Sequence, residues 1–194
     1  MTVLYLVRHA KPAATWGEAT DPGLDAQGAV QAEQRAVDLK TRLAPLRLYT
    51  SPLRRCVETA RPLAALWKVE AAILSPVAEI PSPPLQSAER QTWLAQATQG
   101  TWQELQANAP SGSPDFLAWR STLLTTLCNT TSDSVIYTHY IAINVAVGAA
   151  QEHDRVLSFR PGHASVTTLE VTNGRIAIRE LGAEGSSGGV LLGR

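Results

Sequence analysis

The chain has 194 residues, enough for one sizeable hydrophobic core, and we expect a single domain over residues 1–194. Lys and Arg together number 17 and Asp and Glu also number 17, so the formal net charge at neutral pH is zero. Because no basic block is present either, the composition argues against nucleic acid or an anionic membrane surface as a partner. Any anion that the protein binds must be held by a local cluster of cations.

The first predicted element is a strand over residues 2–7, which are β-branched, aliphatic or aromatic without interruption. Such a run suits a strand that is covered on both faces. Arg8 and His9 follow directly, and ligands of open α/β sheets collect at the carboxyl ends of strands. The strand could therefore hold an imidazole beside a fixed cation. It could also end in two solvated polar residues, and this stretch alone leaves both interpretations open.

The apolar run at the N-terminus does not have the pattern of a signal peptide. It is short, has no basic residue before it and ends at Arg8 and His9 rather than at a small-residue cleavage site. No stretch reaches the length of a membrane span, so we expect a cytoplasmic protein with no membrane partner. Cys56 and Cys128 lie in predicted helices as small buried residues. No clustered ligand spacing predicts a metal site.

A loop and a helix separate the first strand from the second. Residues 11–23 contain two prolines and two glycines, which is typical of a loop. Asp25 is expected to be the N-cap of a helix over residues 26–43, whose small apolar residues recur at helical spacing on one face. Residues 46–50 form a short second strand in this prediction.

Ser51 and Pro52 end that strand and are expected to be the N-cap and first residue of the next helix, which runs to about Trp67. The free N–H groups at a helix N-terminus favour an anion. Arg54 and Arg55 stand in the first turn, where two cations oppose the helix dipole unless an anion lies in front of them. The alternative is that both arginines are surface residues that cover the helix with their stems.

Glu79 is an acidic residue between apolar neighbours, just past a predicted third strand over residues 71–74. An apolar environment raises the pKa of a carboxyl and allows it to donate a proton near neutral pH. An exposed loop carboxylate is the alternative interpretation. Residues 81–84 are rich in proline and predict a stiff, non-helical loop.

Three helices are predicted next, over residues 88–99, 101–107 and 114–128. The strand expected over residues 134–138 is of the buried type, and His139 follows it at once. A helix over residues 141–150 is apolar nearly all round and should be buried.

Two final strands are predicted over residues 164–171 and 175–181, joined by the hairpin signal Asn173-Gly174. The Gly- and Ser-rich residues 182–194 are expected to form a flexible tail. His153 is expected to be exposed, and His163 is expected to be a turn residue, with lining of the site as its less favoured role.

Three strands thus end in His9, in the cationic start of a helix and in His139, and the ends of parallel strands share one edge of a sheet. Two imidazoles and two guanidiniums at this edge would make an anion pocket suited to a phosphoryl group. An uncharged imidazole nitrogen could attack phosphorus if a backbone carbonyl held the other ring nitrogen. No glycine-rich phosphate loop is present, which disfavours a nucleotide-kinase mechanism.

Four motifs are spread in order over most of the chain: Leu6-Val7-Arg8-His9-Ala10, residues 21–32, residues 51–60 and Thr138-His139. They resemble, in turn, the Arg-His-Gly, D-x-x-L-T-x-x-G-x-x-Q-A, S-P-L-x-R-A-x-x-T-A and S-H-G elements of the histidine phosphatase superfamily, the phosphoglycerate-mutase-like proteins. Four motifs in sequence are far more specific than any one of them. They favour the functional interpretation of the Arg and His residues over the solvated one.

The resemblance implies an α/β fold, a three-layer αβα sandwich with a mostly parallel central sheet. It also implies that His9 is the nucleophile that becomes phosphorylated. Arg8, Arg55 and His139 would hold the phosphoryl oxygens and neutralise their charge in the transition state. Glu79 would protonate the leaving oxygen and then activate water.

The chain departs from the family pattern at a few positions. Ala10 replaces the usual glycine, with no expected consequence, and Tyr140 replaces the glycine after the second histidine and is expected to narrow the pocket. After Glu79, the usual glycine and Trp-Glu-Gly segment is absent, and residues 80–84 stand in its place. Counting from Ser51 puts the phosphate-binding arginine at Arg55, with Arg54 at the variable position.

The leading interpretation is a cofactor-independent phosphatase that hydrolyses a phosphomonoester, or phosphohistidine, through a phosphohistidine intermediate on His9. A mutase-type phosphotransferase is an alternative, although mutases of this resemblance are longer and must hold a second phosphate. A second alternative is a non-catalytic module that binds a phosphorylated ligand, although such a module would normally have lost the nucleophile or an arginine. The expected partner is a phosphorylated small molecule, with a phosphoprotein as the alternative. The sequence predicts neither the physiological substrate nor the oligomeric state.

Overall fold

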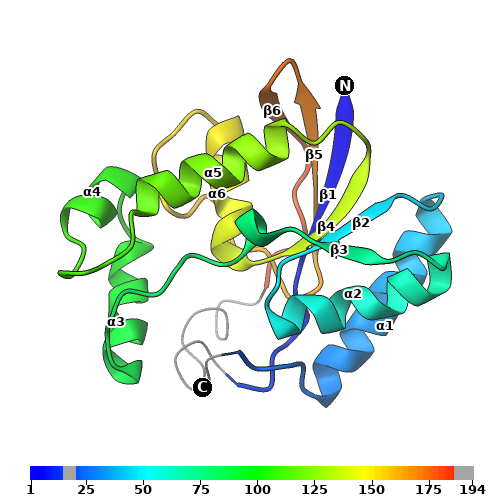
Figure 1. Ribbon diagram of the computed structural model, residues 1–194, viewed down its shortest axis with the longest axis horizontal. Coiled ribbons are helices and arrows are strands. Elements are labelled where there is room, and N and C mark those ends of the chain that lie inside the picture. The colour runs from blue at the N-terminus through cyan, green and yellow to red at the C-terminus, as the bar shows by residue number, and fades with distance from the viewer. Residues whose placement is uncertain (15–20, 186–194) are drawn as a thin grey trace.

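The middle layer of the fold is a mixed sheet, seen nearly edge-on in Figure 1. The structure is a computed structural model of the chain, and residues 1–14 and 21–185 of it are described. Within these residues the sheet has six strands: β1 (Thr2–Arg8), β2 (Arg47–Thr50), β3 (Ala71–Ile73), β4 (Ser134–Thr138), β5 (Val166–Thr172) and β6 (Arg175–Glu180). Their order is β3-β2-β4-β1-β5-β6; the first four are parallel, β5 pairs antiparallel with β1, and β6 pairs antiparallel with β5.

Helices cover both faces of the sheet (Figure 1). One face carries α1 (Ala26–Arg42) and α2 (Arg54–Trp67), which pack against each other. The other face carries α5 (Phe116–Cys128) and α6 (Tyr140–Ala150), with α3 (Ser87–Ala97) and α4 (Trp102–Ala107) beyond them. A short 3-10 helix, η1 (Ser75–Val77), follows β3. The expected α/β architecture, three layers around a mostly parallel sheet, is confirmed.

The uninterrupted apolar run of β1 is explained by burial on both faces. Leu4 and Leu6 pack into the hydrophobic cluster under α5 and α6. Tyr5 and Val7 point the other way, toward the cluster under α1 and α2. The predicted burial of α6 is also confirmed, because its residues from Tyr140 to Gly148 are all buried between the sheet and α5.

Most predicted elements are present within one or two residues of their expected ends. Asp25 is the N-cap of α1, where its Oδ1 accepts the N–H of Gly28 at 2.6 Å. The hairpin between β5 and β6 turns at Asn173 and Gly174, whose φ angles of 52° and 74° are those of a primed turn. Of the predicted loop over residues 11–23, residues 15–20 lie outside the described part of the chain.

The start of α2 differs from the prediction that Ser51 is its N-cap. The helix begins at Arg54, and its N-cap is Leu53, which makes no side-chain capping bond. Ser51 is fully buried instead, and its hydroxyl contacts His139. The hydroxyl of Ser51 therefore bonds to His139, which follows β4, instead of capping α2 as the Ser-Pro pair predicts.

Three further expectations need correction. The first residues of the expected flexible tail are held: Gly182 N donates to Thr167 Oγ1 at 3.2 Å, and Ala183 O accepts from Gly162 N at 2.8 Å. Residues 186–194 lie outside the described residues. His153 is half-buried rather than exposed, and Cys128 is half-buried where full burial was expected.

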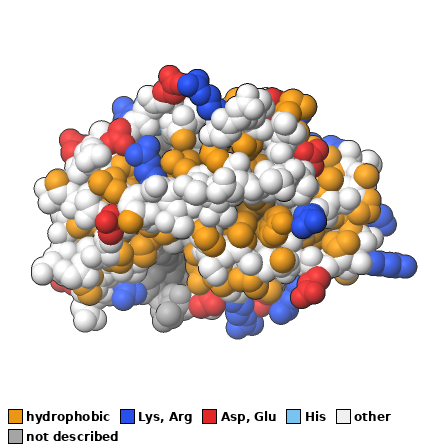
Figure 2. Space-filling view, turned by 45° about the horizontal axis from the view of Figure 1, so that its top comes forward, with side chains coloured by type: hydrophobic (Ala, Val, Ile, Leu, Met, Phe, Trp, Pro, Cys, Tyr) orange, Lys and Arg blue, Asp and Glu red, His pale blue; other side chains and the backbone are white. Residues whose placement is uncertain are grey.

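Charged side chains of both signs are scattered over the face shown in Figure 2, without a patch of one sign. This distribution agrees with the zero formal net charge of the sequence. Among the helices that the structure describes, none is both long and apolar enough to cross a membrane.

Candidate active site

The ends of three parallel strands bring the predicted site residues together. Arg8 of β1 lies in register with Thr138 of β4, and the backbone N–H of His9 donates to Thr138 O at 2.9 Å. Ser51, just past β2, donates its backbone N–H to β4. As a result, the imidazole rings of His9 and His139 face each other with their centroids 5.2 Å apart.

The ring of His9 has one nitrogen fixed and one free. Nδ1 lies 2.9 Å from Ala10 O, and since a carbonyl oxygen only accepts, Nδ1 carries the proton. Nε2 therefore keeps its lone pair. Burial, and then the proximity of His139, Arg8 and Arg55, lowers the pKa of His9 well below its ordinary value. The ring is therefore neutral at physiological pH.

Arg8 is a buried cation held from several sides. Its Nη1 donates to Pro161 O at 2.8 Å, and its Nη2 lies 3.1 Å from Nε2 of His163. The guanidinium carbon lies 4.9 Å from the centroid of the Tyr140 ring, a cation–π contact. Burial lowers the pKa of Arg8 to about 10, so the side chain stays charged at neutral pH. Its Nε is buried and has no hydrogen-bond partner in the described structure.

The two adjacent arginines at the start of α2 have different environments. Arg55 is buried, and its Nη1 is 3.9 Å from Asp21 Oδ1. Arg54 points to solvent and pairs with Glu58 at 2.7 Å. The structure therefore places Arg55, and not Arg54, in the cluster around His9, as the motif count predicts.

Contacts made by the second and third motifs hold α1 and α2 against the loop after β1. Thr59 Oγ1 accepts the N–H of Ala10 at 3.0 Å and donates to Arg55 O at 2.6 Å. Gly28 of α1 lies so close to Lys11 O that an added Cβ would overlap that oxygen. These contacts fix the position of Arg55 relative to the backbone that carries His9.

His139 is fully buried and contacts two side chains, of Ser51 and Cys56, that the sequence did not predict to lie in the site. Its Nε2 lies 2.7 Å from Ser51 Oγ, and Ser51 Oγ accepts the N–H of Leu53 at 3.2 Å. Because a hydroxyl oxygen can accept two N–H groups or donate its own proton, this contact is compatible with either tautomer of His139. Cys56 Sγ lies 3.3 Å from the same Nε2 and donates to Thr138 O at 3.3 Å. Burial, followed by nearby Arg55 and Arg8, lowers the pKa of His139.

Glu79 lies between η1 and the N-terminus of α6, with its side chain half-buried. Its Oε1 accepts the backbone N–H groups of Ile80 at 3.0 Å and of Ile141 at 3.1 Å. Burial raises the pKa of the carboxyl, although these hydrogen bonds and the charges of Arg55 and Arg8 oppose the shift. The direction of the shift agrees with the one that its apolar neighbours predict. The longer contact of Oε2, 3.3 Å from Ile141 N, makes it the freer oxygen.

His163 lines the site as well, in the role that the sequence favoured less. Its ring centroid is 5.8 Å from that of His9, and its Nε2 faces Arg8. The Pro161-Gly162 turn carries it over the end of β1, a long-range approach that no local pattern signals. Tyr140, which was expected to narrow the pocket, lies with its ring against the guanidinium of Arg8.

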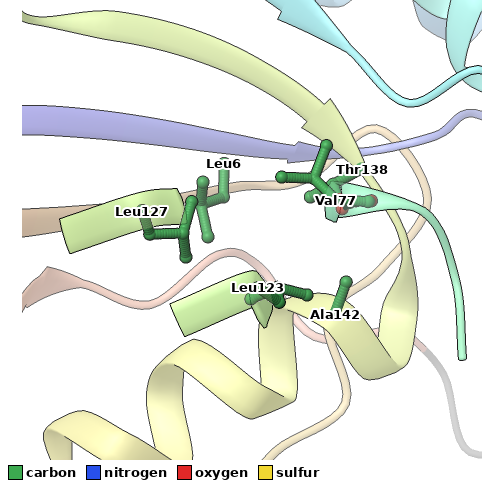
Figure 3. Close-up of a pocket in the computed structure, with 6 residues that line it drawn as sticks. All are labelled: Leu6, Val77, Leu123, Leu127, Thr138 and Ala142. Atoms are coloured by element: carbon green, nitrogen blue, oxygen red, sulfur yellow. Dashed lines mark hydrogen bonds between the residues drawn. The ribbon is translucent and has the colours of Figure 1, made fainter. Parts of the chain in front are cut away.

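An apolar gap lies behind the site, between β1, η1, α5 and α6 (Figure 3). Its walls are Leu6, Val77, Leu123, Leu127, Thr138 and Ala142, and it leaves no space large enough for a water molecule. The Thr138 hydroxyl donates to Val77 O at 2.6 Å and offers nothing to a ligand. The gap is therefore part of the core and not of the anion pocket. Among the described residues, no group of three or more His, Cys, Asp or Glu side chains could hold a metal ion.

A neutral imidazole flanked by two buried guanidiniums and a second imidazole, at the carboxyl edge of a parallel sheet, defines an α/β protein with a phosphoryl-type anion site. The sequence profile of the histidine phosphatase superfamily (branch 1) matches residues 4–184. The chain therefore belongs to the histidine phosphatase superfamily, which confirms the expected phosphatase class. No match was found among curated protein sequences.

Solved structures of other proteins, phosphatases among them, share the fold over nearly their whole length. A mutant phosphoserine phosphatase from Entamoeba histolytica, in complex with phosphoserine, is 22% identical with a TM-score of 0.70, covering 94% of this chain and 98% of that one. A mycobacterial glucosyl-3-phosphoglycerate phosphatase with inorganic phosphate is 22% identical with a TM-score of 0.74, and the match covers 95% of this chain and 98% of that one. Bacillus stearothermophilus YhfR is 20% identical with a TM-score of 0.75, and the match covers 96% of this chain and 98% of that one. At these identities the likeness shows the fold.

Proposed function

We propose that this protein is a cofactor-independent phosphatase that hydrolyses a phosphomonoester through a phosphohistidine on Nε2 of His9. The observation that carries the proposal is the contact between His9 Nδ1 and Ala10 O, which leaves Nε2 unprotonated beside two buried cations. A nucleophile in this state needs no base to activate it.

In the first step, Nε2 of His9 attacks phosphorus and the bond from phosphorus to the ester oxygen breaks. Arg8, Arg55 and His139 bind the three non-bridging oxygens and neutralise the charge of the transition state. The leaving oxygen departs with a proton from Glu79, whose raised pKa favours the acid form.

In the second step, a water molecule attacks the phosphohistidine on the face that the leaving group has vacated. Glu79, now a carboxylate, accepts a proton from this water, and the bond between Nε2 and phosphorus breaks. Inorganic phosphate leaves, and His9 and Glu79 return to their starting protonation states. No redox or metal step is needed for the atoms and charges to balance.

The substrate that we propose is a phosphorylated small molecule with a single phosphate. Solved structures of similar fold contain phosphoserine and 3-phosphoglycerate. Two cations near the site are already paired, Lys11 with Asp25 at 2.9 Å and Arg54 with Glu58 at 2.7 Å. This pairing favours hydrolysis of a monophosphate over a mutase that retains a bisphosphate. We also propose one domain and a cytoplasmic location, in keeping with the free thiols of Cys56 and Cys128.

Hydrolysis of p-nitrophenyl phosphate in the presence of EDTA tests the proposed function. We expect steady turnover that added divalent metal does not raise, because the residues of the pocket supply both the nucleophile and the positive charge. Turnover that EDTA abolishes would contradict the mechanism. Tight binding of a phosphorylated ligand without any turnover would instead establish the binding-module alternative.

If Glu79 is the proton donor, the effect of Glu79→Gln on the reaction rate should depend on the leaving group. The variant should hydrolyse alkyl phosphates about 10²- to 10⁴-fold more slowly, yet p-nitrophenyl phosphate, whose leaving group needs no proton, should still phosphorylate His9 at a similar rate. In the wild type, hydrolysis of alkyl phosphates should decline as the pH rises through the raised pKa of Glu79, because the acid form is then lost. This decline should be absent from the variant.

Steady-state rates on alkyl phosphates and the first-turnover burst of p-nitrophenol, both from pH 5 to pH 9, check this expectation. The matched control is Glu70→Gln, which removes an exposed carboxylate away from the site and should leave both rates unchanged. Equal rates of Glu79→Gln and wild type on both substrate types would remove Glu79 from the mechanism.

A further inference from the structure

The guanidinium of Arg8 is fixed by groups that come from the segment after Phe159, far from β1 in the sequence. Nη1 donates to Pro161 O at 2.8 Å and Nη2 lies 3.1 Å from Nε2 of His163. Both ends of the guanidinium fork are therefore held by one short turn. Nε remains, buried and without a partner in the described structure.

The contact with Arg8 fixes the protonation of His163. Because a guanidinium can only donate, Nε2 of His163 must accept, and the proton of the neutral ring is then on Nδ1. The titratable groups around this ring are Arg8, His9, Lys11 and Asp25. Burial and the cations Arg8 and Lys11 lower the pKa of His163 to about 3, so the ring is neutral throughout the physiological range.

We propose that His163 is a positioning residue, whose Nε2 accepts from Nη2 of Arg8 and, with Pro161 O, holds the guanidinium so that its unpartnered Nε–H is left for the phosphoryl group. This inference rests on the proposed function in one respect, namely that Arg8 binds the phosphoryl group. A hydrogen bond from a charged donor is strong and directional, and an arginine that binds phosphate in a planar fork depends on its orientation. Loss of the acceptor frees the guanidinium to rotate and leaves a buried donor unsatisfied.

Binding of orthovanadate, measured by calorimetry at pH 7.5, tests this role without requiring turnover. His163→Leu removes the acceptor and should weaken vanadate binding about 10- to 100-fold, the effect of losing one charge-assisted hydrogen bond. His163→Gln should stay within about 3-fold of the wild type, because Gln Oε1 lies as many bonds from Cα as Nε2 of histidine and only accepts. His153→Leu, which removes a half-buried histidine outside the site, is the matched control and should bind like the wild type.

Thermal unfolding of each variant accompanies the titrations, so that a loss of fold is not mistaken for a loss of orientation. Wild-type affinity in His163→Leu overturns the proposal. So does equal weakening in His163→Leu and His163→Gln at unchanged melting temperature, since the acceptor is then not the cause. Failure of the wild type to bind vanadate overturns it as well, because Arg8 then binds no phosphoryl group.

The outcomes for the proposed function are separate from these. A wild type that binds vanadate but hydrolyses no phosphate ester contradicts the phosphatase mechanism, while the comparison of Leu and Gln at position 163 still decides the role of His163.

Discussion

His9→Ala should lower kcat/KM for p-nitrophenyl phosphate by at least about 10⁴-fold, the scale of losses seen when a covalent nucleophile is removed. The expectation follows from the arrangement of the ring, whose Nδ1 is held by Ala10 O and whose Nε2 is the unprotonated nitrogen in the pocket. Alanine leaves the cations of Arg8 and Arg55 in place, so phosphate should still bind. The deficit should therefore be in kcat rather than in the affinity for inorganic phosphate.

Steady-state kinetics and product inhibition by inorganic phosphate separate these two effects. His153→Ala is the matched control, because it removes a half-buried histidine that contacts Gln151 and Ser158 instead of the site. It should retain the wild-type rate. Retention of more than a few per cent of the wild-type rate by His9→Ala would contradict its role as the nucleophile.

Arg55→Ala should lower kcat/KM about 10³-fold or more, comparable to the loss of an arginine that stabilises a phosphoryl transition state. Its guanidinium is buried beside the histidine pair, where the low dielectric strengthens its attraction for the phosphoryl oxygens. The adjacent Arg54→Ala should change kcat/KM less than about 3-fold, because its side chain is in solvent and its ion pair with Glu58 is exposed.

The two neighbouring variants form a controlled pair, since each removes one guanidinium from the first turn of α2. Arg55→Lys refines the comparison because it keeps the charge but loses the planar fork, and should recover only part of the rate. A similar loss in Arg54→Ala and Arg55→Ala would mean that the start of α2 acts through its overall charge and not through one bound guanidinium.

The fold and the centre of the site could be predicted from sequence because their signals are local. An uninterrupted apolar strand followed by a polar pair predicted β1 and the position of Arg8 and His9. The same pattern recurred at β4 and His139. Parallel strands bring their carboxyl ends to one edge, so these local patterns also indicated a convergence in space.

The hydrogen bonds that hold the buried polar side chains of the site could not be predicted in this way, because they join residues far apart in sequence. Ser51 had the pattern of a helix N-cap, which is a local signal, but the structure uses its hydroxyl against His139, 88 residues away. His163 had the pattern of a turn residue, and only the packing of its turn over the end of β1 brings it to Arg8, 155 residues away. Where a buried polar group needs a hydrogen-bond partner, a bond to a distant residue can replace the local bond that the sequence pattern predicts.

Glu79 falls between these cases. Its apolar neighbours predicted a raised pKa, and burial in the structure has that effect. Its carboxyl also accepts hydrogen bonds from two backbone N–H groups, one of them in the first turn of α6, and the local sequence pattern does not predict these bonds. They hold the carboxyl in place and limit the rise of its pKa, which keeps both protonation states accessible to one catalytic cycle.

The most direct test of the account is to trap the intermediate. The wild-type enzyme is mixed with a ³²P-labelled phosphomonoester, quenched within the first turnover and digested. We predict a label that is stable to base and labile to acid, as a phosphoramidate is, on the peptide that contains His9, and its absence in His9→Ala. Turnover without such a label, or a label on any other residue, would contradict a phosphohistidine at His9.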